Sequence, residues 1–308
     1  MAMTMGTRTT GHDADPDVLA VRVLHDPDEP IFDQGLAFDL ETLVDRRQVL
    51  RLMGWAGLAT GAVTLAACAP GAISVSPSAT TSTTPGASSV AGAVESCELI
   101  PEETAGPFPG DGTNGPDVLD QSGVVRSDIR SSFDGPTGVA EGVPLTIRLA
   151  IVDAAADCAP LAGAAVYLWH CDREGRYSMY SAGVTEENYL RGVQGAGDDG
   201  LVTFQSVFPG CYAGRWPHIH FEVYPSLETA TDAANRIATS QIALPAESSA
   251  AVYGTTGYED SVSNLAQVSL ERDGVFGEDG GVQQLGTVTG DVVGGLTVDL
   301  TVPVAAGT

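Results

Sequence analysis

The sequence has 308 residues, with 14 basic against 40 acidic side chains and a formal net charge of -26. Every basic residue is arginine. A chain this acidic does not bind nucleic acid non-specifically, because affinity for phosphate comes from clustered positive charge. The hydrophobic content of 43%, with 37 Gly and 18 Pro, favours a turn-rich folded domain over a disordered chain.

The first 45 residues carry ten acidic side chains but only two arginines, Arg8 and Arg22. The first region of an export signal is normally positive. We therefore interpret residues 1–45 as an acidic N-terminal leader, and a wrongly placed start codon is the alternative interpretation.

An export signal is predicted over residues 46–68. The pair Arg46-Arg47 precedes an uncharged apolar run over 52–67, which is short for a membrane-spanning helix but typical of a signal peptide. The paired arginines match a twin-arginine signal, and Leu65-Ala-Ala-Cys68 resembles a bacterial lipobox, which implies acylation of Cys68. We expect twin-arginine export and a lipid anchor on the outer face of the cell membrane. The alternatives are an ordinary signal peptide with an incidental cysteine, or a short membrane anchor.

The remainder of the chain divides into a tether and one domain. Residues 69–96 are rich in Ser, Thr, Ala, Gly and Pro, a composition that cannot bury a core and is typical of a flexible tether. Residues 97–305 are of single-domain size.

The domain is predicted to be all-β: an antiparallel β-sandwich with long loops and little helix. Apolar and polar residues alternate in short segments separated by Gly and Pro, as in sandwiches. A short helix over 229–238 is the one helical segment considered. The predicted strands are 145–152, 165–170, 201–207, 218–224, 265–270 and 296–302.

Two histidines in the segment Trp216-Pro-His-Ile-His-Phe221 are candidate metal ligands. Residues i and i+2 of a strand point to the same face, so His218 and His220 converge on one side while Ile219 and Phe221 face the other. Two imidazoles on one face supply half of a metal site. By itself, such a pair also occurs by chance, in cupins and in zinc enzymes.

The surrounding motifs resemble the intradiol ring-cleavage dioxygenases, the family of the catechol and protocatechuate dioxygenases. The family order is a strand ending in Trp, then Gly-x-Tyr, Pro-Gly-x-Tyr and Arg-x-x-His-x-His. Here these motifs are a strand ending at Trp169, Gly175-Arg-Tyr177, Pro209-Gly-Cys-Tyr212 and Arg215-Trp-Pro-His-Ile-His220. The segment 188–194 (NYLRGVQ) is most similar to the exported bacterial branch of the family.

The resemblance implies a ferric site with four protein ligands: Tyr177, Tyr212, His218 and His220. In the family, a small aromatic diol of the catechol type binds the iron and displaces the tyrosine that corresponds to Tyr212. Dioxygen then cleaves the ring between the two hydroxyl-bearing carbons and yields a muconate-type dicarboxylate. Tyrosinate oxygens suit Fe(III), because Fe(III) is a hard cation. The phenol of a free tyrosine has a pKa near 10, so the bound cation must displace its proton.

Two further residues receive catalytic roles through the same resemblance. Arg215 would stabilise negative charge that develops on the ring, and Gln241 resembles a family glutamine that helps to orient this region. A third histidine, His170, is interpreted as structural.

Two other functions remain open at this stage. The domain could be a non-catalytic β-sandwich of a surface lipoprotein that binds a ligand or a cell-wall component. A zinc or Fe(II) enzyme is a weaker alternative, because no carboxylate lies at a matching position around the histidine pair. The helix through which many cytosolic family members dimerise is not visible, so the oligomeric state stays open.

Removing Cys68 from the five cysteines leaves Cys97, Cys158, Cys171 and Cys211, an even number that predicts two disulfides in an exported domain. Free buried thiols are the alternative. Cys171 and Cys211 flank the two tyrosines, where a thiolate would compete for iron. We therefore expect Cys171 to be disulfide-bonded, with Cys158 or Cys211 as its partner.

Overall fold

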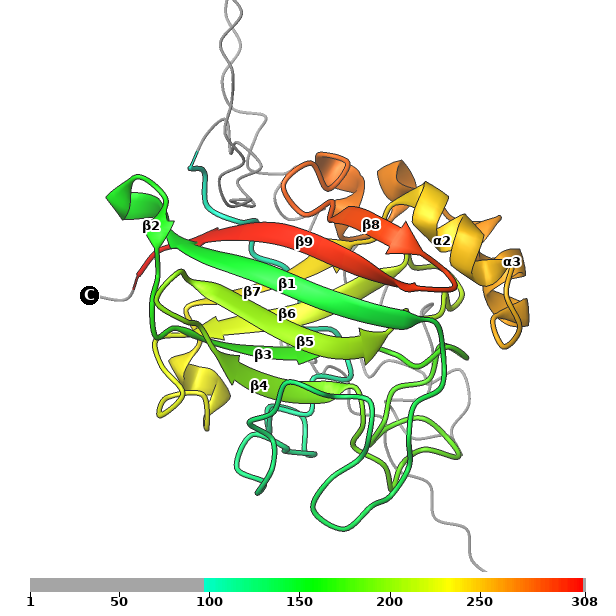
Figure 1. The fold of residues 1–308 in the computed structure, drawn as a ribbon, viewed down its shortest axis with the longest axis horizontal. Coiled ribbons are helices and arrows are strands. Elements are labelled where there is room, and N and C mark those ends of the chain that lie inside the picture. The colour runs from blue at the N-terminus through cyan, green and yellow to red at the C-terminus, as the bar shows by residue number, and fades with distance from the viewer. Residues whose placement is uncertain (1–96, 307–308) are drawn as a thin grey trace, which may run out of the picture.

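The computed structural model describes residues 97–306, which form a sandwich of two β-sheets (Figure 1). The predicted leader (1–45), the signal (46–68) with Arg46, Arg47 and Cys68, and the tether (69–96) lie outside the described residues. Within the described part of the chain, no helix is long and apolar enough to cross a membrane.

The two sheets contain five and four strands. The five-stranded sheet consists of β1 (Pro144–Asp153), β2 (Ala159–Pro160), β5 (Leu201–Val207), β8 (Thr287–Asp291) and β9 (Gly295–Val304). The four-stranded sheet has the order β4 (Arg191–Gly195), β3 (Ala165–Trp169), β6 (His218–Tyr224) and β7 (Ala238–Ala243).

The predicted all-β sandwich is confirmed, with one departure from an antiparallel arrangement. β1 pairs with β9 in parallel, so that Leu145 lies beside Leu296, whereas every other strand pair of the two sheets is antiparallel. The C-terminal strand therefore runs alongside the first long strand, and the sheet is mixed.

The main core lies between the sheets and follows from alternation along the strands. In β1, Leu145, Ile147 and Leu149 are buried while the residues between them are more exposed. Ile219 and Phe221 of β6 join the same core from the opposite sheet. Burying each such side chain contributes about 1.5–3 kcal/mol, which makes this layer the main source of stability.

The four-stranded sheet is also covered on its outer face, so both faces of β6 are buried. Residues of the long N-terminal segment, including Val118 and Leu119, pack there against Tyr167 and Trp169 of β3. The outer face of this sheet is thus a second, smaller core enclosed by loops, and the histidine pair projects into it.

The sequence-based strand predictions succeed where alternation is strong. The bounds 201–207 and 218–224 match β5 and β6, and the predictions at 145–152, 165–170 and 296–302 differ by one to two residues at an end from β1, β3 and β9. Four strands were not predicted, because they are short or contain several small residues: β4, β7, β8 and the two-residue β2.

Two of the other segment predictions were wrong. Residues 265–270 are not a strand: Leu265 ends α3 (Glu259–Leu265), and the 3-10 helix Leu270–Arg272 follows. Leu265 and Val268 pack against the core although they are not in a strand. In so short a segment, their spacing of three residues is easily mistaken for the alternation of apolar and polar residues in a strand. Residues 229–238 contain a 3-10 helix at Ala233–Asn235 instead of an α-helix, and Ala238 already begins β7.

Short helices account for the rest of the regular structure. α2 (Ala246–Tyr253) and α3 lie together at one end of the sandwich (Figure 1), and both are too short to show a helical period in the sequence. Two more 3-10 helices span Ala154–Ala156 and Phe276–Glu278.

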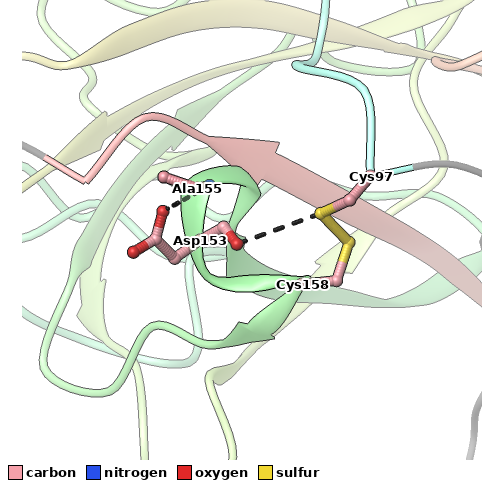
Figure 2. The surroundings of a disulfide bond; sticks show 4 residues. All are labelled: Cys97, Asp153, Ala155 and Cys158. Carbon is pink, nitrogen blue, oxygen red and sulfur yellow. Dashed lines mark hydrogen bonds between the residues drawn. A yellow bond between two sulfur atoms is a disulfide. The ribbon is translucent and has the colours of Figure 1, made fainter.

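One disulfide joins Cys97 to Cys158 across a sequence separation of 61 (Figure 2). Cys158 follows the turn after β1, which is capped by the Asp153 carboxylate accepting a hydrogen bond from the Ala155 amide at 2.9 Å. The bond anchors the start of the described chain to the end of β1. From there the segment crosses to the other sheet, where the Glu103 amide donates to the Thr239 carbonyl at 2.8 Å.

The expectation of a disulfide at Cys171 was wrong, because Cys171 and Cys211 are free and buried. Their thiols face backbone carbonyls instead: Cys171 Sγ donates to Gly210 at 3.5 Å and Cys211 Sγ to Arg215 at 3.6 Å. Burial raises the pKa of Cys211 to about 12 and that of Cys171 well above its usual value. Both thiols therefore stay protonated, which removes the competing thiolate without a disulfide.

We expect the variant Cys97→Ser/Cys158→Ser to lose up to about 4 kcal/mol of unfolding free energy, because the crosslink closes a loop with a sequence separation of 61. Urea unfolding of the non-reduced proteins measures this loss. A reductant should lower wild type to the level of the variant and leave the variant unchanged. Alkylation of Cys97 or Cys158 in unfolded, non-reduced protein would contradict the pairing.

Candidate metal centre

Two strand residues and two loop residues bring four donor groups together on the outer face of the four-stranded sheet. His218 and His220 project from β6 on the side opposite Ile219, as the sequence predicted. Tyr177 lies in the loop between β3 and β4, and Tyr212 lies in the loop between β5 and β6. Each tyrosine follows a strand that is embedded in the sandwich, so its loop starts from a fixed point.

A glycine permits the two tyrosine loops to approach each other. Gly175 has a φ of +82°, in the left-handed region that favours glycine, and a Cβ there would lie 3.1 Å from Cβ of Tyr212. On the other side of the site, Gly106 has a φ of +74°, and a Cβ there would lie 3.3 Å from Cε1 of His220. The N-terminal segment therefore passes close over the histidine ring.

The four donor atoms form a tight cluster. Tyr177 Oη lies 3.5 Å from Tyr212 Oη, 3.3 Å from His218 Nε2 and 3.2 Å from His220 Nε2. His218 Nε2 lies 3.2 Å from Tyr212 Oη and 3.1 Å from His220 Nε2. A tetrahedral metal with bonds of about 2.0 Å separates its ligands by roughly 3.3 Å, so these positions fit one shared ion.

Two different contacts orient the imidazoles. His218 Nδ1 lies 2.6 Å from the Trp216 carbonyl, which requires a proton on Nδ1 and leaves the Nε2 lone pair for the cluster. The ring of His220 stacks on Trp169, with centroids 4.9 Å apart and an interplanar angle of 6°. Its Nδ1 has no hydrogen-bond partner among the described residues, so the orientation of this ring is fixed by stacking and not by a hydrogen bond.

Burial keeps all four donor groups neutral in the absence of a cation. It lowers the pKa of His218 to about 3 and that of His220 well below its usual value, so both lone pairs stay free. It raises the pKa of Tyr212 to about 12 and that of Tyr177 well above its usual value. A metal that takes these phenols as phenolates must therefore carry enough charge to displace both protons.

The tyrosines are essential to any metal site at this position. Among residues 97–306, no group of three or more His, Cys, Asp or Glu side chains could hold a metal ion. The donor set is two phenol oxygens and two imidazole nitrogens, without a carboxylate or a thiolate. This set fits a hard, highly charged cation better than a soft one.

The two predicted catalytic side chains lie next to the cluster and contact each other. Gln241 of β7 is directly opposite His220 of β6, and its Nε2 donates to the Thr104 carbonyl at 2.9 Å. Arg215 is buried and donates from Nη2 to Gln241 Oε1 at 2.8 Å. Its positive charge lowers the pKa of Tyr212 against the larger effect of burial.

Asp273 is a further residue of the site that the sequence did not predict. Its carboxylate forms a salt bridge with Arg215, with Oδ2 at 3.0 Å from Nε. Asp273 lies 58 residues downstream of Arg215 in a segment without a recognisable motif, so no local signal pointed to it.

His170 lies outside the cluster, as predicted. Its Nδ1 is 2.8 Å from the Cys171 carbonyl and its Nε2 is 2.7 Å from Ser206 Oγ, so both ring nitrogens have partners. The ring ties the end of β3 to β5.

Comparisons with known proteins point in the same direction as the geometry. A family model described as Dioxygenase matches residues 114–236, which include the four clustered residues and Arg215. No curated protein sequence matches the chain.

Solved structures share the fold. An intradiol ring-cleavage dioxygenase from Tetranychus urticae is 26% identical with a TM-score of 0.54, and the alignment covers 69% of this chain and 96% of that one. A second dioxygenase structure is 25% identical with a TM-score of 0.55 and the same coverage of both chains. By this family match and by these structures, the chain is similar to the intradiol ring-cleavage dioxygenases.

Proposed function

We propose that the protein is a ferric dioxygenase that cleaves a catechol-type aromatic diol between its two hydroxyl-bearing carbons and yields a muconate-type dicarboxylate. The observation that carries the proposal is the cluster of two tyrosine hydroxyls and two histidine Nε2 atoms, in which five of the six pairs are separated by 3.1–3.5 Å. The relationship to intradiol dioxygenases supports the same chemistry.

Fe(III) suits this donor set because two phenolates offset two of its three charges and provide hard oxygen ligands. Tyr177, Tyr212, His218 and His220 would hold it. When bound, the iron supplies the charge that ionises the phenols and activates the diol towards dioxygen. Zinc and Fe(II) sites more often include carboxylate or thiolate ligands, and among the described residues no such group completes the cluster.

Tyr212 is the ligand best placed to give way to a substrate. Tyr177, His218 and His220 are buried, whereas Tyr212 is partly exposed and precedes the exposed residues Ala213 and Gly214. A diol that enters from this side meets Tyr212 first, and the other three residues keep the site assembled. This arrangement supports the expectation that Tyr212 is the displaced ligand.

Arg215 is placed to stabilise negative charge on the substrate. Its buried guanidinium lies beside Gln241 and acts electrostatically on both tyrosines. A fixed positive charge in a site with little water stabilises charge that develops during reaction more strongly than it would in solvent. Gln241 accepts from Arg215 and donates to Thr104, and so holds the guanidinium against the N-terminal segment.

We further propose that the protein acts outside the cytoplasm, as a lipid-anchored member of the exported bacterial branch. Arg46-Arg47, the apolar run and Cys68 support this location in the sequence. The Cys97–Cys158 disulfide adds independent support, because disulfides persist mainly in oxidising compartments.

The first test measures bound iron and the visible absorption of the protein. Protein loaded with Fe(III) should absorb visible light through tyrosinate-to-iron charge transfer and consume dioxygen when a catechol is added. Tyr177→Phe and His220→Ala should each lower iron affinity by at least about tenfold and bleach the band, since each removes a direct ligand. The matched control is Tyr180→Phe in the same loop, whose hydroxyl contacts Asn114 and the Gly110 amide. A colourless wild type that takes up no iron would favour a ligand-binding lipoprotein instead.

Arg215→Ala should retain iron and the visible band but reduce kcat by roughly 100-fold, because the arginine acts on charge in the transition state rather than on the metal. Stopped-flow absorbance and oxygen uptake with a panel of catechols measure the effect. Normal turnover in this variant would remove Arg215 from the mechanism.

Export and anchoring are tested by cell fractionation. Arg46→Lys/Arg47→Lys should keep the protein in the cytoplasm, and Cys68→Ala should release exported protein from the membrane, since stable anchoring needs acyl chains. Arg22→Lys in the leader serves as the control. Membrane-bound Cys68→Ala protein would count against the lipid anchor.

A further inference from the structure

A buried acid, Asp273, binds the Arg215 side chain in addition to Gln241. Asp273 lies between the 3-10 helices Leu270–Arg272 and Phe276–Glu278, and its side chain is fully buried. Oδ2 accepts from Arg215 Nε at 3.0 Å and Oδ1 accepts from Nη2 at 3.3 Å. The carboxylate therefore engages the fork of the guanidinium with both oxygens.

The backbone in turn fixes the carboxylate. Oδ2 also accepts from the Trp216 amide at 2.7 Å, and Oδ1 accepts from the amides of Val275 and Phe276 at 2.9 and 3.2 Å. Burial opposes ionisation of Asp273, but Arg215 and these amides outweigh it and hold its pKa below the usual value. The aspartate is thus a charged, rigid acceptor that contacts the residue next to Arg215 as well as its side chain.

The two contacts leave the guanidinium little freedom. An unpaired arginine samples many rotamers and loses that freedom only at a cost in entropy. Here Asp273 holds Nε and Nη2, and Gln241, opposite His220 in the sheet, accepts from Nη2 at 2.8 Å. A buried ion pair of this kind adds little net stability, so its main consequence is the fixed position of the charge beside the donor cluster.

We propose that Asp273 is a positioning residue: it fixes the Arg215 guanidinium in the orientation in which its charge acts on the substrate. The catalytic part of this inference rests on the function proposed above, whereas the Asp273–Arg215 pair itself does not. Asp273 lies beyond the segment 114–236 that the family model matches. The segment that carries Asp273 therefore contributes to the site through Arg215.

The test is a double-mutant cycle on the full-length, iron-loaded protein, with Asp273→Asn, Arg215→Ala and the combined variant. Asparagine matches aspartate in shape, and its oxygen can still accept from the Val275 and Phe276 amides, but its NH2 group faces the N–H groups of Arg215. Asp299→Asn is the control, since Asp299 pairs with Arg148 at 2.6 Å on the other sheet.

In kinetics, Asp273→Asn should lower kcat by about tenfold with KM and the visible band nearly unchanged. In the Arg215→Ala background the same change should alter kcat by less than about twofold, because a residue that acts through Arg215 has no effect without it. Asp299→Asn should not change kcat. Unchanged kcat in Asp273→Asn, or an equal loss with and without Arg215, would overturn the positioning role.

Urea unfolding provides a measurement that does not depend on turnover. Arg215→Ala leaves the buried Asp273 charge unpaired, so adding Asp273→Asn should raise the unfolding midpoint of that variant. A midpoint lowered by the sum of the two single effects would show that the pair does not exist. If wild type cleaves no catechol, the proposed function and the catalytic role both fail, and the unfolding cycle alone decides whether Asp273 holds Arg215.

Discussion

The site depends on the two-sided burial of β6. Ile219 and Phe221 face the core between the sheets, while His218 and His220 face the outer core beneath the loops. A shift of the strand by one residue would place imidazoles in the main core and isoleucine in the site, so the register is strongly determined. The histidine pair is therefore a rigid base on which the remaining donors are assembled.

Two loops add the tyrosine hydroxyls to the histidine pair of β6. Trp169, at the end of the neighbouring strand β3, stacks on His220 and orients the ring, and the chain then continues into the loop that carries Tyr177. Gly175 lets this loop approach the Tyr212 loop closely. The four donor groups thus come from one strand and two loops, and each loop begins at a strand that the sandwich holds in place.

Electrostatics in the site differ from those of the protein as a whole. The chain has a formal charge of -26, yet the donor cluster consists of groups that burial keeps neutral until a cation arrives, and the positive charge of Arg215 acts on all four of them. Arg215 is already matched by Asp273. The site therefore holds a fixed positive charge beside the donor cluster, as the proposed reaction requires.

The sequence by itself determined the strongly alternating strands and the sandwich class, because strand periodicity is a local property of the chain. The order of its motifs, through the resemblance to a family, predicted that Tyr177, Tyr212, His218 and His220 belong to one site. Only the tertiary structure decided the parallel β1–β9 pair, the Cys97–Cys158 disulfide and the contact of Asp273 with Arg215. An even number of cysteines does not tell which of them are paired. Asp273 lies 58 residues from Arg215 in the sequence, so no local motif links the two. These contacts join distant parts of the chain, and their formation depends on how the two sheets and their loops pack together.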